Sequence, residues 1–172
     1  MPEWIEHLNS DVLSPYCTRL IGGYREPFYK APVEGMPAEI RFTCDYERSA
    51  LHELAHWCIA GEQRRKLDDF GYWYEPDGRT LSQQHLFFNV EIRPQAIEKH
   101  FCDALEIYFE VSADNLGNFP QKQLNQFSQR VYTQYTRYLV SGFPSRANKI
   151  YHCLCDWYQA QNNHPTTTQQ SG

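Results

Sequence analysis

Apolar and polar residues alternate along Ala38–Asp45, which has the sequence AEIRFTCD. A period of two residues is typical of a strand with one buried face. The preceding segment, Leu20–Met36, is interrupted by glycine and proline, which predicts a loop or irregular extended chain. The alternation of Phe70, Tyr72 and Tyr74 predicts a further strand. We therefore expect a few short strands in the first half of the chain.

Apolar residues three and four positions apart mark most of the remaining chain, and this spacing predicts helices. Asp45 is a candidate N-cap and Gly61 a candidate stop for one helix of about 15 residues. Pro94 starts or kinks another helix, because proline lacks a backbone donor. The expected helices are Pro2–Leu8, 46–60, 82–92, Pro94 to about Leu105, Lys122–Gly142 and 146–159.

Two segments near the ends of these helices have a different character. Residues 106–112, EIYFEVS, predict a short strand or an extended piece. Residues 161–172 are polar and repetitive, and we expect them to be a disordered tail. The pattern as a whole predicts an α+β fold, with a single helix-rich domain over residues 1–160 and a small sheet.

Composition excludes several classes of protein. The chain of 172 residues is 41% hydrophobic, enough for a substantial core, and its net charge of −5 favours no dense basic face for nucleic acid. No apolar run reaches the roughly 20 residues of a membrane span, and the N-terminus lacks the apolar region of a secretory signal. We expect a cytoplasmic protein without direct nucleic-acid or membrane contacts, and with its six cysteines reduced.

The helix expected after Asp45 contains the sequence HELAH, with His52, Glu53 and His56. Residues four apart share one face of a helix, so the two imidazoles can bind one metal ion. Glu53 lies about 100° further round and can reach the open side of the metal. Alternatively, both histidines face solvent. The apolar residues around them favour burial instead, where His and Glu need partners.

Two histidines need a third protein ligand, most often a carboxylate or another histidine. Glu91 is the first candidate, because a returning helix can bring it to the two imidazoles. The alternatives are Glu62, Glu98 and the acidic pair Asp68 and Asp69.

Two histidines and one carboxylate with open positions occur in hydrolytic zinc sites and in non-heme Fe(II) oxygenases. In a zinc hydrolase, a protease or a nuclease, Glu53 would be the general base. In an iron enzyme, O2 and substrate would use the open positions, and Glu53 would orient a ligand or handle a proton. A third possibility is a non-catalytic adaptor, although purely structural metal sites are closed and usually richer in cysteine.

Three longer strings follow one another in the chain: HELAHWCIAGEQRR, DFGYWYEPDGR and VEIRPQA. Their order and spacing resemble the bacterial elongation factor P hydroxylase family, from about Tyr46 to Phe143. The resemblance implies a zincin-like arrangement, similar to a metal-dependent ribonuclease of ribosome maturation, and a motif of two His and one carboxylate. His52 and His56 match the helix motif, and Glu91 falls in the third string.

The resemblance also implies an activity. Members hydroxylate the lysine of elongation factor P that already carries a β-lysyl group, which points to Fe(II) as cofactor and O2 as co-substrate. Zinc or another divalent ion could replace iron in a crystal. The sequence identifies no electron donor, since it has no G-x-G-x-x-G motif and no 2-oxoglutarate signature. Arg64 and Arg65 either contact an acidic protein partner or neutralise the end of the metal-binding helix.

A lysine-type arm is cationic at its tip and apolar along its stem, and would suit a pocket with carboxylates and aromatic faces. Asp69, Tyr72, Trp73 and Tyr74 follow the metal-binding helix, and we predict that they bind the substrate. The alternative is that the aromatic residues form one buried face of a strand.

Overall fold

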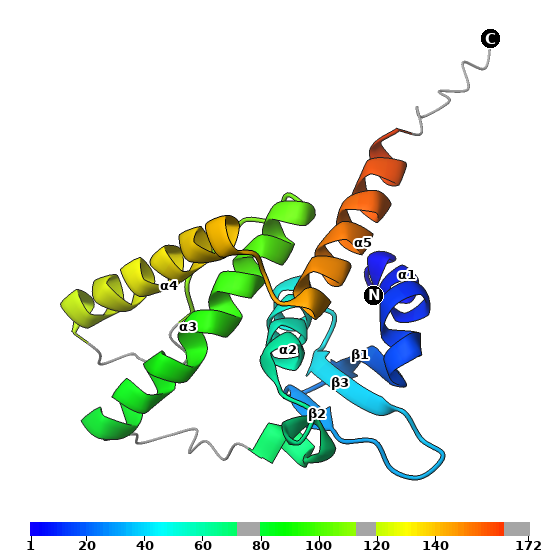
Figure 1. Ribbon diagram of the computed structural model, residues 1–172, viewed down its shortest axis with the longest axis horizontal. Helices are drawn as coiled ribbons and strands as arrows, with labels where there is room; N and C mark the ends of the chain where they lie inside the picture. The colour runs from blue at the N-terminus through cyan, green and yellow to red at the C-terminus, as the bar shows by residue number, and fades with distance from the viewer. Residues whose placement is uncertain (72–79, 113–119, 164–172) are drawn as a thin grey trace.

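The computed structural model describes residues 1–71, 80–112 and 120–163. The sheet and the N-terminal helix lie on one side of a central helix, and two long helices lie on the other (Figure 1). This arrangement confirms the predicted helix-rich α+β fold with a small sheet. The helices are α1 (Trp4–Leu8), α2 (Glu47–Ile59), α3 (Leu81–Ala104), α4 (Gln121–Ser141) and α5 (Ser145–Asn162), and the strands are β1 (Thr18–Tyr24), β2 (Phe28–Lys30) and β3 (Ala38–Thr43).

The sheet has the order β1-β3-β2, with β1 parallel and β2 antiparallel to β3. Alternate residues of β3 are buried, as predicted for that segment. Of the two possibilities predicted for Leu20–Met36, the loop is wrong for most of β1 and all of β2, and extended chain is correct, with a register shift between Ile21 and Tyr24. A Cβ on Gly22 would meet Cys44 O and the Phe42 ring at 2.6 Å. This glycine therefore allows close packing inside the sheet and does not mark a loop.

Helix α2 is the predicted metal-binding helix, and it packs against β3 and α3. Its N-cap is Tyr46, so the assignment of Asp45 to that position is wrong. At the other end, the carbonyl oxygen of Ala60 accepts hydrogen bonds from Arg65 and Arg146, each at 2.6 Å. Arg65 therefore satisfies the end of the helix, which is one of its two predicted roles.

Helix α3 is one continuous helix of 24 residues, so the prediction of two helices separated at Pro94 is wrong. Thr80 and Gln83 form a capping box that fixes its start. The helix packs against α2, α4 and α5, and these contacts stabilise it across the hydrogen bond that Pro94 cannot donate. Because the helix is continuous, residues on both sides of Pro94 share one face.

Helices α4 and α5 confirm the predicted C-terminal pair. Gly142 ends α4 with a φ of 92°, a value that favours glycine. The imidazole of His100, on α3, lies parallel between the rings of Phe143 and Tyr151, with ring centroids 3.7 and 3.8 Å away. This stack, hereafter the aromatic stack, joins α3 to α5 and to the turn that precedes it.

Three further predictions are only partly met. Residues 106–112 form no strand. Phe70 has a φ of 57° within the turn η4 (Asp68–Gly71), so it is not part of a strand, and Tyr72 and Tyr74 lie outside the described residues. Residues 161 and 162, assigned to the tail, belong to α5, and residues 164–172 lie outside the described residues.

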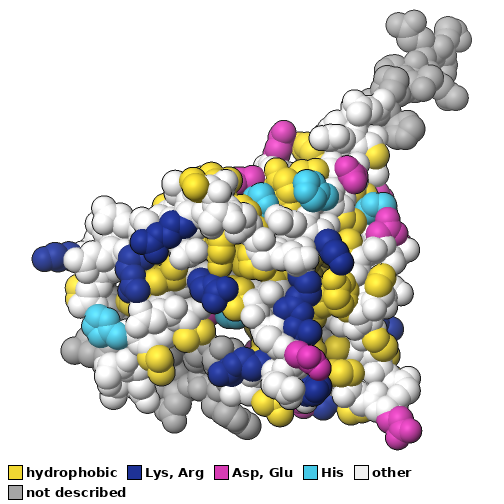
Figure 2. Space-filling view, viewed as in Figure 1, with side chains coloured by type: hydrophobic (Ala, Val, Ile, Leu, Met, Phe, Trp, Pro, Cys, Tyr) yellow, Lys and Arg dark blue, Asp and Glu magenta, His cyan; other side chains and the backbone are white. Residues whose placement is uncertain are grey.

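The surface charge, the helices and the cysteines can be compared with what the composition predicts. Lys and Arg side chains gather across the middle of one face, in spite of the negative net charge (Figure 2). No helix within the described ranges is long and apolar enough to cross a bilayer. All six cysteines lie in the described part of the chain and are free thiols.

Candidate metal centre

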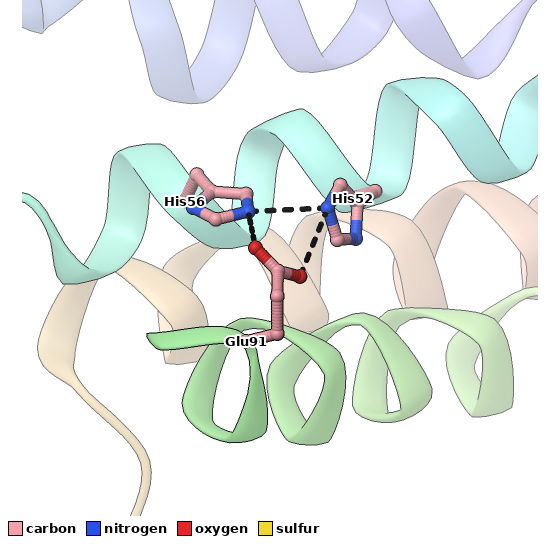
Figure 3. Close-up of side chains that lie close together, drawn as sticks. All are labelled: His52, His56 and Glu91. Carbon is pink, nitrogen blue, oxygen red and sulfur yellow. Dashed lines mark hydrogen bonds and ion pairs between the residues drawn. The ribbon is translucent and has the colours of Figure 1, made fainter. Parts of the chain in front are cut away.

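Three side chains converge between α2 and α3 (Figure 3). Nε2 of His56 lies 3.0 Å from Oε1 of Glu91, and Nε2 of His52 lies 3.4 Å from Oε2 of the same carboxylate. The two Nε2 atoms are 3.1 Å apart, and the donor atoms of the three residues lie within 4.8 Å of one another. Ligands about 2.0–2.2 Å from a common ion are spaced about as closely as this. Glu91, the first-ranked candidate for the third ligand, is thus the carboxylate that meets the two imidazoles.

The electrostatics of this cluster favour positive charge at its centre. Burial raises the pKa of Glu91, but the charges of His56 and His52 outweigh it and bring the pKa to about 2. Burial lowers the pKa of His52, but the charges of Glu91 and Glu98 outweigh it and bring the pKa to about 10. A site that keeps an imidazole protonated in spite of burial also stabilises a divalent cation bound to the same atoms. The donor set therefore fits a metal ion.

A second carboxylate, that of Glu98, contacts the ring nitrogen of His52 that does not face Glu91. Nδ1 of His52 lies 2.9 Å from Oε2 of Glu98, whose side chain is almost fully buried. The other carboxylate oxygen accepts hydrogen bonds from Nε and Nη2 of Arg48, which also donates to the carbonyl of Glu110. Hence Glu98 is not the third ligand of the cluster. It places the proton of His52 on Nδ1 and leaves Nε2 free to bind a metal.

Gln95 supports the cluster from the same face of α3. Its Nε2 lies 3.5 Å from Oε2 of Glu91 and donates to the carbonyl of Ser112 at 2.6 Å. Its Oε1 accepts the backbone N–H of Ser112 at 3.0 Å. Gln95 therefore fixes both the ligand carboxylate and the chain segment beside it.

The sequence analysis missed Arg48 and Gln95. Arg48 lies four residues before His52, and Gln95 lies four after Glu91, so helical spacing from the candidate ligands was the available signal.

Glu53 faces a cavity next to the cluster. The cavity has a volume of about 430 Å³, within the range of about 300–1,000 Å³ typical of small-molecule sites. Burial raises the pKa of Glu53, His52 and His56 lower it, and Glu91 and Asp69 raise it, with a net upward shift. The cavity is lined by Pro27, Thr43, Arg48, Ser49, His52, Glu53, Gln95, Glu98 and Ser112.

The remaining ligand alternatives lie elsewhere. Glu62 is exposed and pairs with Lys66 at 3.4 Å. Asp68 pairs with Lys30 at 2.7 Å and accepts the backbone N–H of Ala31. Asp68 therefore attaches its turn to the chain at β2, and neither carboxylate belongs to the cluster.

Asp69, the fourth alternative, accepts the backbone N–H of Tyr29 at 2.9 Å. Next to it, Phe70 stacks on the ring of Tyr29 at 4.1 Å, which fixes η4 on β2. Asp69 thus does not belong to the cluster of His52, His56 and Glu91, although its charge acts on Glu53. Tyr72, Trp73 and Tyr74, the other predicted substrate-binding residues, lie outside the described residues.

Comparison with known proteins agrees with the family resemblance of the sequence motifs. A family model described as elongation factor P hydroxylase matches residues 8–169 of the chain. The elongation factor P lysine hydroxylase of Haemophilus influenzae is 39% identical over 168 residues, which cover 92% of this chain and 94% of that protein. The match extends on both sides of the region from Tyr46 to Phe143 in which the resemblance was first seen.

Proposed function

The chain belongs to the elongation factor P hydroxylase family, and from this premise we propose that it is a protein-lysine hydroxylase acting on elongation factor P. We further propose that its substrate is the lysine that already carries a β-lysyl group. The observation that carries the proposal is the convergence of His52, His56 and Glu91 on one point beside a cavity. Two imidazoles and one carboxylate are the ligand set of non-heme Fe(II) oxygenases.

His52, His56 and Glu91 would hold the ion through two Nε2 atoms and one or both carboxylate oxygens. Bound Fe(II) supplies the capacity to activate O2 at positions that the protein leaves open. Hydroxylation places one oxygen atom into a C–H bond of the substrate. The second oxygen leaves as water, with two electrons from an external reductant and two protons.

Residues around the three ligands orient them and leave room for the substrate. Glu98, itself held by Arg48, keeps the ring of His52 in the orientation and tautomer that a ligand needs. Gln95 restrains Glu91 and so limits its carboxylate to the side of the imidazoles. The cavity beside Glu53 gives the substrate arm access to the same point.

A zinc hydrolase with Glu53 as general base is not favoured. The ligand geometry alone is compatible with zinc, but the family match over residues 8–169 is to hydroxylases. The role of Glu53 as a catalytic residue stays a prediction, as do the substrate contacts of Asp69, Tyr72, Trp73 and Tyr74.

Three broader proposals accompany this function. We propose that residues 1–160 form one domain and that its arrangement is zincin-like, similar to a metal-dependent ribonuclease of ribosome maturation. We also propose that the protein works in the cytoplasm, because its substrate is a translation factor.

The test is to purify the protein without oxygen and load it with Fe(II). It is then incubated with O2, a reductant and lysylated elongation factor P. Mass spectrometry should show one added oxygen on the modified lysine of the wild-type reaction. A His56→Ala variant, which lacks one ligand, should give no such product. If the wild-type enzyme leaves the substrate mass unchanged, the proposed function is wrong.

A further inference from the structure

Glu53 has an unusual position for a carboxylate beside a metal site. Among the described residues, none forms a hydrogen bond or an ion pair with its side chain, whereas Glu91 and Glu98 each have two or more partners. Its carboxylate nevertheless lines the cavity that reaches His52. The Glu53 side chain is half-buried and lines an open cavity, so its carboxylate is available to a cationic group of another molecule.

Charge around the cavity indicates what that molecule is. Among the described residues that line the cavity, Arg48 is the only Lys or Arg side chain, and Glu98 already pairs with it. Glu98 pairs with both Arg48 and His52, so Glu53 is the carboxylate without an ion-pair partner among the described residues that line the cavity. A single ammonium group would balance its charge.

The rest of the wall fits the stem of such a group. Pro27 offers apolar surface, and Ser49 lies one helical turn before Glu53 on the same face of α2. An alkyl amine buries its methylenes against apolar surface and keeps its charged head at a polar partner.

We propose that Glu53 is the residue that recognises the amine of the substrate arm, and that it does so by an ion pair within this cavity. The inference rests on the proposed function, because it assigns a contact to the lysyl-type substrate of that reaction. Glu53 lies next to His52 in sequence, so the ion pair would fix the aliphatic chain of the arm close to the metal ligands. Glu53 is then a specificity-determining residue and not a general base.

The test uses two forms of elongation factor P, made with either a β-lysyl or a hexanoyl group on the target lysine. The two groups have the same carbon chain, and only the lysyl group has amines. Binding to the Fe(II)-loaded full-length enzyme is measured by calorimetry without oxygen. Wild-type enzyme should prefer the lysyl form by about 10- to 100-fold, the range expected for one charge-assisted contact.

Glu53→Gln should abolish most of this preference while its iron content stays at the wild-type level. Glu53→Asp, which keeps the charge on a shorter side chain, should retain part of the preference. Glu62→Gln is the matched control, because it removes an exposed carboxylate just past the same helix, and it should behave as wild type.

The proposal is overturned if Glu53→Gln keeps the full preference, if it loses its iron, or if wild-type enzyme binds both forms equally. It is also overturned if Glu53→Gln keeps the preference but has a greatly reduced kcat, as expected of a general base. Mass spectrometry of the lysyl form in air separates the two proposals. An unchanged substrate mass would contradict the hydroxylase function, whereas the preference for one arm is measured by binding alone.

Discussion

His52 on α2 and His100 on α3 lie in opposite environments. His52 lies between Glu91 and Glu98, and their charges raise its pKa to about 10 in spite of burial. His100 lies between the rings of Phe143 and Tyr151, and burial lowers its pKa to about 4. Both rings are largely removed from water, so burial alone does not decide the charge of an imidazole. The partners decide it: carboxylates prepare one site for a cation, and aromatic faces leave the other ring neutral.

The largest expected effect comes from removing the carboxylate of Glu91, the candidate third ligand of the metal site. Glu91→Ala should lower the affinity for Fe(II) by more than about 100-fold and abolish hydroxylation, because loss of an outer partner alone costs about 10–100-fold. Metal content after dialysis measures this, with circular dichroism as the check on folding. Glu62→Ala, which removes an exposed carboxylate, is the control and should keep its metal. Full iron content in Glu91→Ala would show that another residue is the third ligand.

A smaller effect is expected from the partner of His52. Glu98→Gln should weaken Fe(II) binding by about 10–100-fold, because it loosens the orientation of His52 and leaves Arg48 without its carboxylate. Titration with Fe(II) under anaerobic conditions measures the affinity. Asp103→Asn removes a carboxylate from the same helix, where it accepts hydrogen bonds from Lys99 and Tyr135, and should leave the affinity unchanged. Equal affinities in wild type and Glu98→Gln would rule out this role.

The last expected effect concerns the aromatic stack, and it is an effect on stability and not on metal binding. The pKa of His100 is about 4 in the folded protein and about 6.5 when unfolded, so only the unfolded chain binds a proton there between these values. The contribution of His100 to the free energy of unfolding is therefore complete above about pH 6.5 and falls as the pH drops towards 4. The loss is up to about 3 kcal/mol, since one pKa unit corresponds to about 1.4 kcal/mol.

Denaturant unfolding of wild type and His100→Gln between pH 4 and pH 8 isolates this contribution. Other groups titrate in both proteins, so the difference between the two curves reports on residue 100. The difference should favour wild type most above pH 6.5. A difference that grows in favour of wild type at low pH would mean that Phe143 and Tyr151 hold an imidazolium by cation–π contacts. Metal content should be unaffected in either case.

Local patterns were sufficient for several parts of the molecule. The period of β3 and the helical spacing of α2, α4 and α5 predicted elements that the structure confirms. The HELAH spacing determined that His52 and His56 share a helix face, because a separation of four residues has the same geometry in any helix. Glu91 does lie beside the two imidazoles, since a second helix can approach them from the opposite side, and its role as the third metal ligand stays a prediction.

Tertiary structure decided what local patterns could not. Gly22 and Pro94 look like interruptions in sequence, but close packing in the sheet requires the first, and contacts with three helices accommodate the second. The roles of the acidic residues were ambiguous for the same reason. Glu91, Glu98 and Asp69 have the same charge, and only their three-dimensional neighbours separate a candidate metal ligand, a support for His52 and an anchor for β2. Sequence alone therefore determined which face of α2 carries the imidazoles, whereas packing of α3 against α2 determined the carboxylate that completes the cluster, because distance and burial depend on the whole fold.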